Sequence, residues 1–440
     1  MTLAKRLLLG SAAAVVATTG AQAADLGLPV APAVDYVQIC EVAGMTGFIL
    51  PGSDVCFDIN GFARFQAEFF SDFIPNDGLD NTLTFLQERG VDDEYNFEGV
   101  FELNFDARTM TEWGLLRGFI RIDSTGGNNG DSNVLLQKAF IQIGGLTAGY
   151  TDSFFDPVYT DYALGETDAA DGGATDLALI GYAFSFGNGV TLLASLEEGP
   201  NRRNGFAGLN PGAVPALVFG QLAGNDVFDN DDSVPDFVAA LLLEQAWGSA
   251  KLSGAIGELD PNDIRSGPAG AVEIDSEFGY AIGASVEIGL PFGVDSVFGA
   301  FALYGHGMNG YTGTPFFDAL IDASGDVKLT TTYSLGAGVE IGLTPQLDWE
   351  LDAYYSHVDH DTDIAAIDAD ASVFAVRTSL AYTPINNLEF RAGVGYTTFD
   401  DSDIAGLDLL TQRGNIVDFT PGVDDTDDIF AAGFRITRSF

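Results

Sequence analysis

The sequence contains few basic residues. Its 440 residues include 18 Lys and Arg against 64 Asp and Glu, a formal net charge of -46. A chain this acidic repels the phosphate backbone of nucleic acids, which excludes nucleic-acid binding as a function. Only 19% of the residues are charged whereas 46% are hydrophobic. This is not the composition of a disordered acidic tail, so we expect the chain to fold.

Beyond its first residues the chain also lacks long apolar runs. Residues 1-23 have a basic start, an apolar run from Leu7 to Val16, and the small residues Ala21-Gln22-Ala23. This pattern predicts a secretory signal peptide that is cleaved before Ala24, with an uncleaved anchor as the alternative. Further along, no stretch of about 18 apolar residues occurs, which excludes a helical inner-membrane protein.

Cysteine and histidine are also scarce. In an exported chain Cys40 and Cys56 predict a disulfide that stabilises by roughly 3 kcal/mol, with two free thiols as the alternative. The histidines are His306, His357 and His360, and no G-x-S-x-G motif, nucleotide-binding Gly loop or Cys-based metal site accompanies them. We therefore expect no catalytic site, no cofactor and no metal, and keep an outer-membrane hydrolase as an alternative.

What the sequence has in abundance is alternation of apolar and polar residues. The odd positions from 57 to 69 are Phe57, Ile59, Gly61, Ala63, Phe65, Ala67 and Phe69, and the even ones include Asp58, Asn60, Arg64, Gln66 and Glu68. The same pattern recurs at 94-108, 347-355 and 388-396. A period of two residues predicts β-strands with one apolar face.

The lengths of the strands and connections separate a membrane barrel from a soluble β protein. The alternating segments have about 9 to 13 residues, enough for a tilted strand to cross a bilayer, whereas strands of soluble proteins have about 5 or 6. Short turns at 289-293, 343-345 and 383-387 alternate with long polar loops such as 305-327, 357-371 and 400-427. This asymmetry is typical of outer-membrane barrels.

The predicted fold is therefore all-β, a transmembrane antiparallel β-barrel of about 16 strands with short periplasmic turns and long external loops. We expect a signal peptide at 1-23, a periplasmic or plug-proximal segment with the disulfide at 24-55, and the barrel at 56-440. The candidate strands lie near 56-70, 93-108, 113-123, 134-144, 146-151, 175-186, 190-198, 237-247, 249-258, 277-288, 294-305, 328-342, 347-357, 372-382, 388-399 and 429-440. The stretch 199-236 is expected to be a long loop.

The external loops are rich in Asp. Asp359, Asp361 and Asp363 have the spacing that begins a calcium loop, but Ile364 stands where an EF-hand has Gly and Asp370 where it has Glu. We therefore expect a solvated acidic rim rather than a dedicated metal site, and leave open whether it binds Ca²⁺ or Mg²⁺. A secreted calcium-binding β protein is a further alternative.

The chain ends in an alternating segment that stops on Phe440, which resembles the recognition signal for outer-membrane barrel assembly, although Arg438 departs from it. More broadly, the chain resembles the alphaproteobacterial porins of the rhizobial type. The resembling stretches are VDYVQIC at 34-40, ILPGSDVC at 49-56, INGFAR at 59-64, AFIQIGGLTAG at 139-149, SFFD at 153-156, FGNG at 186-189 and RSF at 438-440.

This resemblance implies a trimeric, sixteen-stranded, passively conducting channel whose third external loop folds inward to form a constriction. The expected partners are outer-membrane lipid and lipopolysaccharide, the barrel assembly machinery, two further copies of the chain, and small hydrophilic solutes and cations. By the family pattern the constriction loop spans about 151-175. Its acidic residues are Asp152, Asp156, Asp161, Glu166, Asp168 and Asp171.

Basic residues on the inward faces of the first strands are candidates for the opposite wall. They are Arg64, Arg108, Arg117 and Arg121, with Lys138 as a further candidate. One hypothesis is a transverse field between acidic loop and basic wall, which orients dipolar solutes. The other is that the arginines neutralise wall acids such as Glu68, Glu98 and Glu102. Under both hypotheses the excess of acids predicts a cation preference, which screening within about 8 to 10 Å keeps moderate.

The constriction loop also carries aromatic residues. Phe154, Phe155, Tyr159 and Tyr162 either form an aromatic slide for sugars or pack the loop onto the wall. The expected function is therefore passive diffusion of small hydrophilic solutes and ions, with a sugar-specific channel as the alternative.

Overall fold

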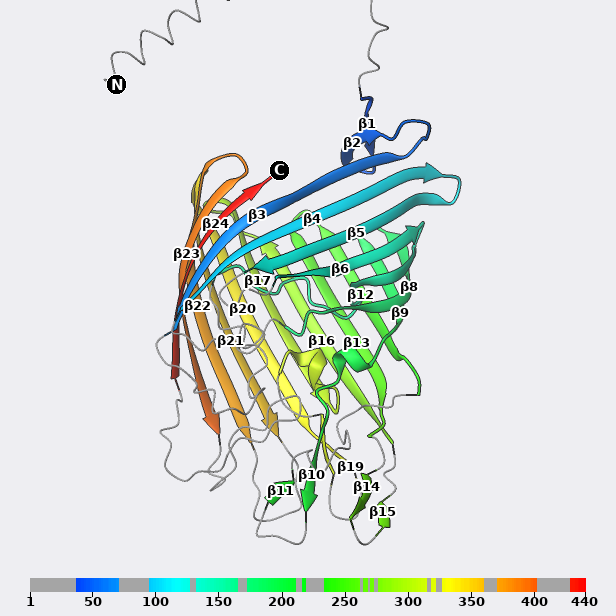
Figure 1. The fold of residues 1–440 in the computed structure, drawn as a ribbon, viewed down its shortest axis with the longest axis vertical. Helices are drawn as coiled ribbons and strands as arrows, with labels where there is room; N and C mark the ends of the chain where they lie inside the picture. Colours follow the sequence, from blue (N-terminus) through cyan, green and yellow to red (C-terminus); the bar gives the residue numbers. More distant parts are fainter. Residues whose placement is uncertain are drawn as a thin grey trace, which may run out of the picture.

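The chain forms a closed antiparallel barrel (Figure 1). The computed structural model describes residues 37–70, 95–126, 132–164, 172–210, 216–218, 233–261, 264–267, 270–272, 276–314, 318–321, 327–359, 370–401 and 428–440. The predicted signal peptide lies outside these residues. Within them, sixteen strands follow one another around the barrel, which confirms the predicted fold class.

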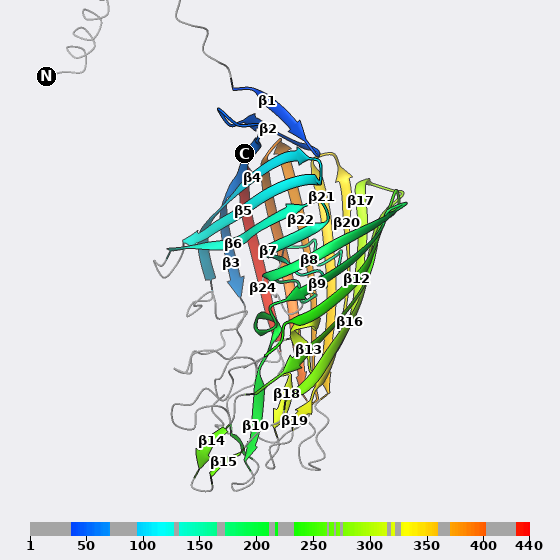
Figure 2. The same cartoon turned by 90° about the vertical axis from the view of Figure 1, so that its right-hand side faces the viewer.

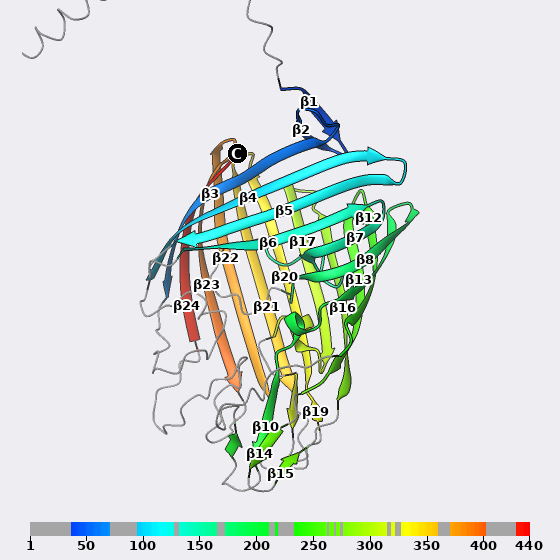
Figure 3. The same cartoon turned by 45° about the vertical axis from the view of Figure 1, so that its right-hand side comes forward.

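The barrel strands are long and joined alternately by short turns and long loops. They are β3 (Cys56–Phe70), β4 (Tyr95–Thr111), β5 (Gly114–Gly126), β6 (Ser132–Ile143), β7 (Leu146–Asp152), β8 (Asp176–Gly187), β9 (Val190–Glu197), β12 (Asp236–Gln245), β13 (Gly248–Leu259), β16 (Glu277–Gly289), β17 (Val294–His306), β20 (Thr331–Thr344), β21 (Leu347–Asp359), β22 (Ala371–Ile385), β23 (Leu388–Asp401) and β24 (Asp428–Ser439). Strands β3 to β6 cross the barrel at a larger tilt from its long axis than β21 to β24 (Figure 3).

Pairing of the last strand with the first closes the sheet. In β24, Arg435 lies opposite Gln66 of β3, and Thr437 lies opposite Arg64. The backbone of Phe440 also exchanges two hydrogen bonds with Gly61, at 3.0 and 3.2 Å. Closure leaves none of these strands with an unpaired edge.

The alternation has the opposite sense to that of a soluble protein. In β3, Phe65 and Phe69 face outward and are 42% and 47% exposed, whereas Gln66 is 4% exposed and Glu68 is fully buried. Burying carboxylates while displaying phenyl rings is unfavourable in water, but it suits a barrel whose outer face contacts hydrocarbon. The exposure pattern therefore argues against a secreted soluble protein.

A short hairpin precedes the barrel. It consists of β1 (Ile39–Val42) and β2 (Met45–Ile49), and a disulfide joins Cys40 to Cys56 at the start of β3, as predicted. Two residue pairs extend β2 onto β3. At the hairpin turn, the carbonyl of Ala43 accepts a hydrogen bond of 2.8 Å from Arg108 of β4. The hairpin lies at the end of the barrel that holds the C-terminus (Figure 1).

That end also carries the short turns. Between β8 and β9 the turn is formed by Asn188 and Gly189, with φ of 51° and 72°. Two successive residues with positive φ are typical of the type I′ turn, which joins strands with the right-handed twist of a sheet.

Short strands that belong to the long loops lie at the opposite end, among them β10, β14, β15, β18 and β19 (Figure 2). The predicted loop 199-236 contains η1 (Pro200–Arg202), β10 (Phe206–Asn210) and β11 (Ala216–Val218). The loop after β17 contains η2 (Asn309–Thr312), β18 (Ala319–Ile321) and β19 (Val327–Leu329), and β10 pairs in parallel with β18. A separate hairpin follows β13, made of β14 (Ile264–Gly267) and β15 (Gly270–Val272). None of the helices in the described residues is long and apolar enough to cross a membrane.

Replacing Cys40 and Cys56 with Ser should loosen the hairpin and leave the barrel closed, because besides the disulfide the two elements are joined by two residue pairs and the hydrogen bond from Arg108 to Ala43. We expect the hairpin to lose about 3 kcal/mol of stabilisation. Hydrogen exchange should speed up in Ile39–Val42 and Met45–Ile49, while heat-dependent gel mobility, which reports the folded barrel, stays unchanged. Equal protection in both proteins would show that strand pairing and the Arg108 contact hold the hairpin without the disulfide.

Candidate functional site

The loop after β7 lies inside the barrel. We call residues 153–175 the inward loop; the structure describes 153–164 and 172–175 of it. Its first residues are held by the inward faces of β9 and β13. Glu197 accepts hydrogen bonds of 2.6 Å from the Ser153 hydroxyl and 2.9 Å from the Phe154 amide, and the Ser253 hydroxyl donates one of 2.8 Å to the Phe155 carbonyl.

The far part of the loop is held by Asp352 of β21. This carboxylate accepts hydrogen bonds from the Tyr159 hydroxyl at 2.5 Å, the Tyr162 amide at 3.0 Å, and the Ala163 amide. Burial, with Tyr354 and Asp352 nearby, raises the pKa of Tyr159, so its hydroxyl remains a donor. One buried carboxylate thus holds three residues of the loop within the stretch 159–163.

The wall beneath the inward loop is built from small residues. A Cβ atom added at Gly299 would overlap the ring of Tyr159, and one at Gly393 would overlap the carbonyl oxygen of Leu164. At Gly283 it would come within 3.2 Å of Phe155. The wall therefore receives the loop because these inward positions carry no side chain.

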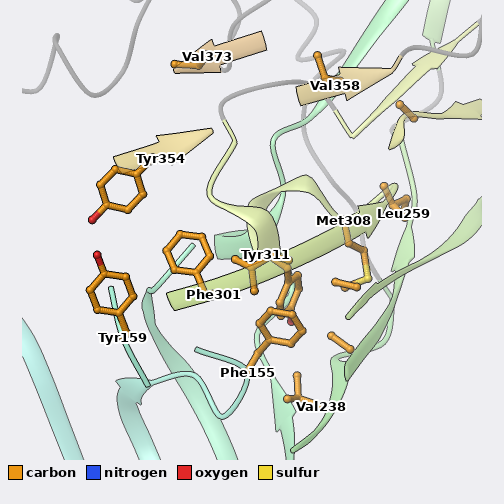
Figure 4. Close-up of a cluster of buried hydrophobic side chains, with 14 of the residues drawn as sticks. Phe155, Tyr159, Val238, Leu259, Phe301, Met308, Tyr311, Tyr354, Val358 and Val373 are labelled. Atoms are coloured by element: carbon orange, nitrogen blue, oxygen red, sulfur yellow. The ribbon is translucent and has the colours of Figure 1, made fainter. Parts of the chain in front are cut away.

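Apolar packing completes this seat (Figure 4). Phe155 lies edge-on to Tyr311 with ring centroids 4.8 Å apart, and Tyr159 lies beside Phe301. Phe155 and Tyr159 are almost fully buried. These two rings pack the loop onto the wall instead of lining an open path, and Tyr162 packs partly buried against the same cluster.

A single arginine from another loop joins both ends of the inward loop. Arg202 of η1 is 1% exposed. Its guanidinium donates to the carboxylate of Asp156 and to the carbonyl of Gly173, and lies over the ring of Tyr311 at 4.5 Å. Burial raises the pKa of Asp156 to about 6 although Arg202 opposes the shift, so the carboxyl is ionised at neutral pH.

A buried polar network supports Arg202 from the side of the long loops. Arg203 donates to Asp236 of β12 at 3.0 and 2.5 Å, and the Tyr311 hydroxyl donates to the same carboxylate at 2.8 Å. Asp318, just before β18, accepts the backbone amides of Asn204, Gly205 and Asn309, and burial raises its pKa to about 7. The loops after β9 and β17 are thereby fixed to each other and to the wall.

The structure places the predicted acids of the inward loop in different settings. Asp152 ends β7, and its carboxylate lies 2.5 Å from the ammonium of Lys138. Asp156 is buried against Arg202, whereas the side chain of Asp161 is 47% exposed, 3.5 Å from Arg377 of β22. Glu166, Asp168 and Asp171 lie outside the described residues.

The predicted basic residues all have contacts within the wall. Arg108 and Arg117 both reach Asp106, at 2.8 and 2.9 Å. Arg121 lies 3.6 Å from Glu102 and also donates to Asn104. Arg64 donates to the hydroxyl of Thr437 at 3.2 Å.

Several important residues were not among the sequence candidates. Arg377, Arg391 and Arg435 point inward from β22, β23 and β24, and the inward-facing parity of these strands is the signal that could have identified them. Arg202 sits in a loop without periodicity, so no comparable signal marked it.

The histidines and acids are also possible metal ligands. No group of three or more His, Cys, Asp or Glu side chains in the described ranges is arranged to hold a metal ion. His306 contacts Thr331 and His357 contacts Ser372, each through Nδ1. The predicted acidic series continues from Asp359 into Asp361 and Asp363, which fall outside the described residues, as does His360.

Comparison with known proteins shows which proteins this chain is similar to. The chain is 31% identical to porin Omp2b of Brucella canis over 260 residues, which make up 56% of this chain and 63% of that porin. It is equally similar to porin Omp2b of Brucella suis over 264 residues, with 56% and 64% covered. The matches thus span less than two thirds of the length of these relatives.

A solved structure and a family profile agree with the similarity to porins. The outer membrane channel DcaP of Acinetobacter baumannii has the same fold, with a TM-score of 0.65 at 16% identity, over 90% of this chain and 99% of that chain. A profile described as the porin subfamily matches residues 28–420. Because this match covers most of the chain, the protein is an outer-membrane β-barrel that belongs to the porin subfamily.

Proposed function

We propose that the protein is a passive diffusion channel for small hydrophilic solutes and ions, and not an enzyme. The observation that carries this proposal is that charged side chains on the inward faces remain partly exposed beside a firmly held loop. Arg121 and Glu102 are 32% and 19% exposed, and Asp161 of the inward loop is 47% exposed. The barrel interior therefore holds water next to the loop, as a sieving channel requires.

The channel prefers cations in this proposal. Acids outnumber bases in the chain by 64 to 18. Asp156 adds little to the field because Arg202 neutralises it within the protein, whereas Asp161 is open to water. Asp152 and the three acids outside the described residues, Glu166, Asp168 and Asp171, keep their proposed place at the constriction.

The opposing basic wall is weaker than a set of free arginines would be. Arg108 and Arg117 share Asp106, and Arg121 has Glu102 nearby. These pairs reduce the transverse field that the same arginines would otherwise set up against the loop. A net negative pore with moderate selectivity fits this arrangement better than an anion-selective one.

The further partners follow the family. We propose a homotrimer in contact with outer-membrane lipid and lipopolysaccharide, assembled by the barrel assembly machinery through the terminal strand that ends at Phe440. The pairing of Phe440 with Gly61 of the first barrel strand supports a role for this residue in closure.

Single-channel recording in a planar bilayer tests both the channel and its selectivity. The unmodified protein should give stepwise conductance and a cation-selective reversal potential in a KCl gradient. Asp161→Asn should shift that potential towards zero, with a change of less than about twofold in the permeability ratio because salt screens the charge. Glu112→Gln, which removes an exposed acid from the turn after β4, is the matched control and should leave the ratio unchanged. Anion selectivity of the unmodified protein would refute the cation preference, and a folded barrel without conductance would refute the channel.

Arg202→Met should loosen the inward loop while the barrel stays folded. The variant leaves Asp156 buried without its cation, at a cost of about 3–5 kcal/mol, which the loop can relieve by moving. We expect noisier single-channel currents and faster cleavage of the loop by added protease. Adding Asp156→Asn to the same chain should restore most of the quiet conductance, since it removes the stranded charge. Currents identical to those of the unmodified channel in Arg202→Met would show that Arg202 does not hold the loop.

A further inference from the structure

Three arginines gather on the inner wall close to the seam of the barrel. Arg391 of β23 lies directly opposite Arg435 of β24, and Arg435 in turn lies opposite Gln66 of β3. Arg64, two residues before Gln66, extends the group to a third strand. Like charges placed directly opposite each other on neighbouring strands destabilise a sheet. The direct pairing of Arg391 with Arg435 therefore carries a cost in folding.

Arg64 and Arg435 each make a contact with a neutral side chain. Arg64 donates to the Thr437 hydroxyl at 3.2 Å and lies over the Phe62 ring at 4.3 Å. Arg435 donates to the amide oxygen of Gln66 at 2.8 Å.

Arg391 is bound differently. It has carboxylates nearby, Glu350 at 3.1 Å and Glu389 at 3.2 Å. It also donates at 3.1 Å to the Tyr162 carbonyl of the inward loop.

The three arginines share a cavity of about 350 Å³. Its lining includes Phe62, Arg64, Glu389, Arg391, Arg435 and Thr437, so three positive charges face one negative charge. The turn residue Asn387 also lines the cavity, which places the cavity towards the short-turn end of the barrel. This volume suits a small organic molecule.

We propose that Arg64, Arg391 and Arg435 form an oxyanion-binding subsite for solutes that carry a carboxylate or phosphate group. Guanidinium groups present paired N–H donors that match the two oxygens of such a group. Such an anion should bind favourably because it offsets the positive charge of the arginine cluster. Chloride, which has no paired oxygens, should bind more weakly. The role of the subsite in transport rests on the proposed channel function: it gives organic anions a binding step inside a lumen that otherwise favours cations.

Binding is tested first without conductance. Isothermal titration calorimetry of the detergent-solubilised full-length protein with citrate and, separately, with inorganic phosphate should show saturable binding. Arg64→Gln with Arg435→Gln should weaken it at least tenfold. Removing two mutually repelling charges should leave the barrel folded, and heat-dependent gel mobility checks this. Arg64→Lys with Arg435→Lys, which keeps the charge and loses the fork, should fall between the two.

The matched control is Arg438→Gln. Arg438 lies on the same strand as Arg435 at the same end of the barrel, but contacts the carbonyls of Asn386 and Asn387 at 3.1 and 2.9 Å. Losing its charge should change affinity by less than twofold. Tighter binding of citrate would assign the subsite to carboxylates, and tighter binding of phosphate to phosphorylated solutes. No saturable binding of either, or equal binding by the unmodified and Gln proteins, would overturn the proposal.

Conductance then separates this inference from the proposed function. If the channel conducts, citrate added on the short-turn side should reduce its KCl current in the unmodified protein and not in the Gln variant. Binding without conductance would refute the channel and support the subsite. Conductance with no effect of citrate or phosphate, together with the absence of binding, would refute the subsite and support the channel.

Discussion

Backbone pairing between β24 and β3 is the contact on which the remaining structure depends. In hydrocarbon an unpaired N–H or C=O costs several kcal/mol, so a spanning sheet must close on itself. Once it is closed, a period of two residues sends alternate side chains to lipid and to the interior. The acids of the strands therefore collect inside, where they either find partners or meet water.

Inside the barrel, the wall is divided into two kinds of surface. Beneath the inward loop its residues are small, as at Gly283 and Gly299, and the loop with Phe155 and Tyr159 fills the space. On β4 and β5 the inward positions are charged, as at Glu102 and Arg121, and stay partly open to solvent. The loop is thus part of a packed core on one side and borders water on the other, which lets a rigid structure flank a hydrated path.

The period of two residues was sufficient to predict the barrel and its strand count. The disulfide could be predicted because the exported chain has only two cysteines. The inward positions of β16, which are Gly279, Ala281, Gly283 and Ser285, carry a further signal, because small residues on the inner face mark the wall that a loop covers. Arg202 had no such signal. Its role arises from contacts between three loops that are distant in sequence, and no period in the chain encodes them. Nor could the division of acids into buried and exposed, as between Asp156 and Asp161, be foreseen without knowing what packs against each.

Parallel pairing of β10 with β18 has a consequence for how the outer surface is recognised. Strands β11, β10, β18 and β19 form one small sheet from two separate loops at the external end. An antibody or bacteriophage that docks there contacts a composite epitope, which neither loop presents as an isolated peptide.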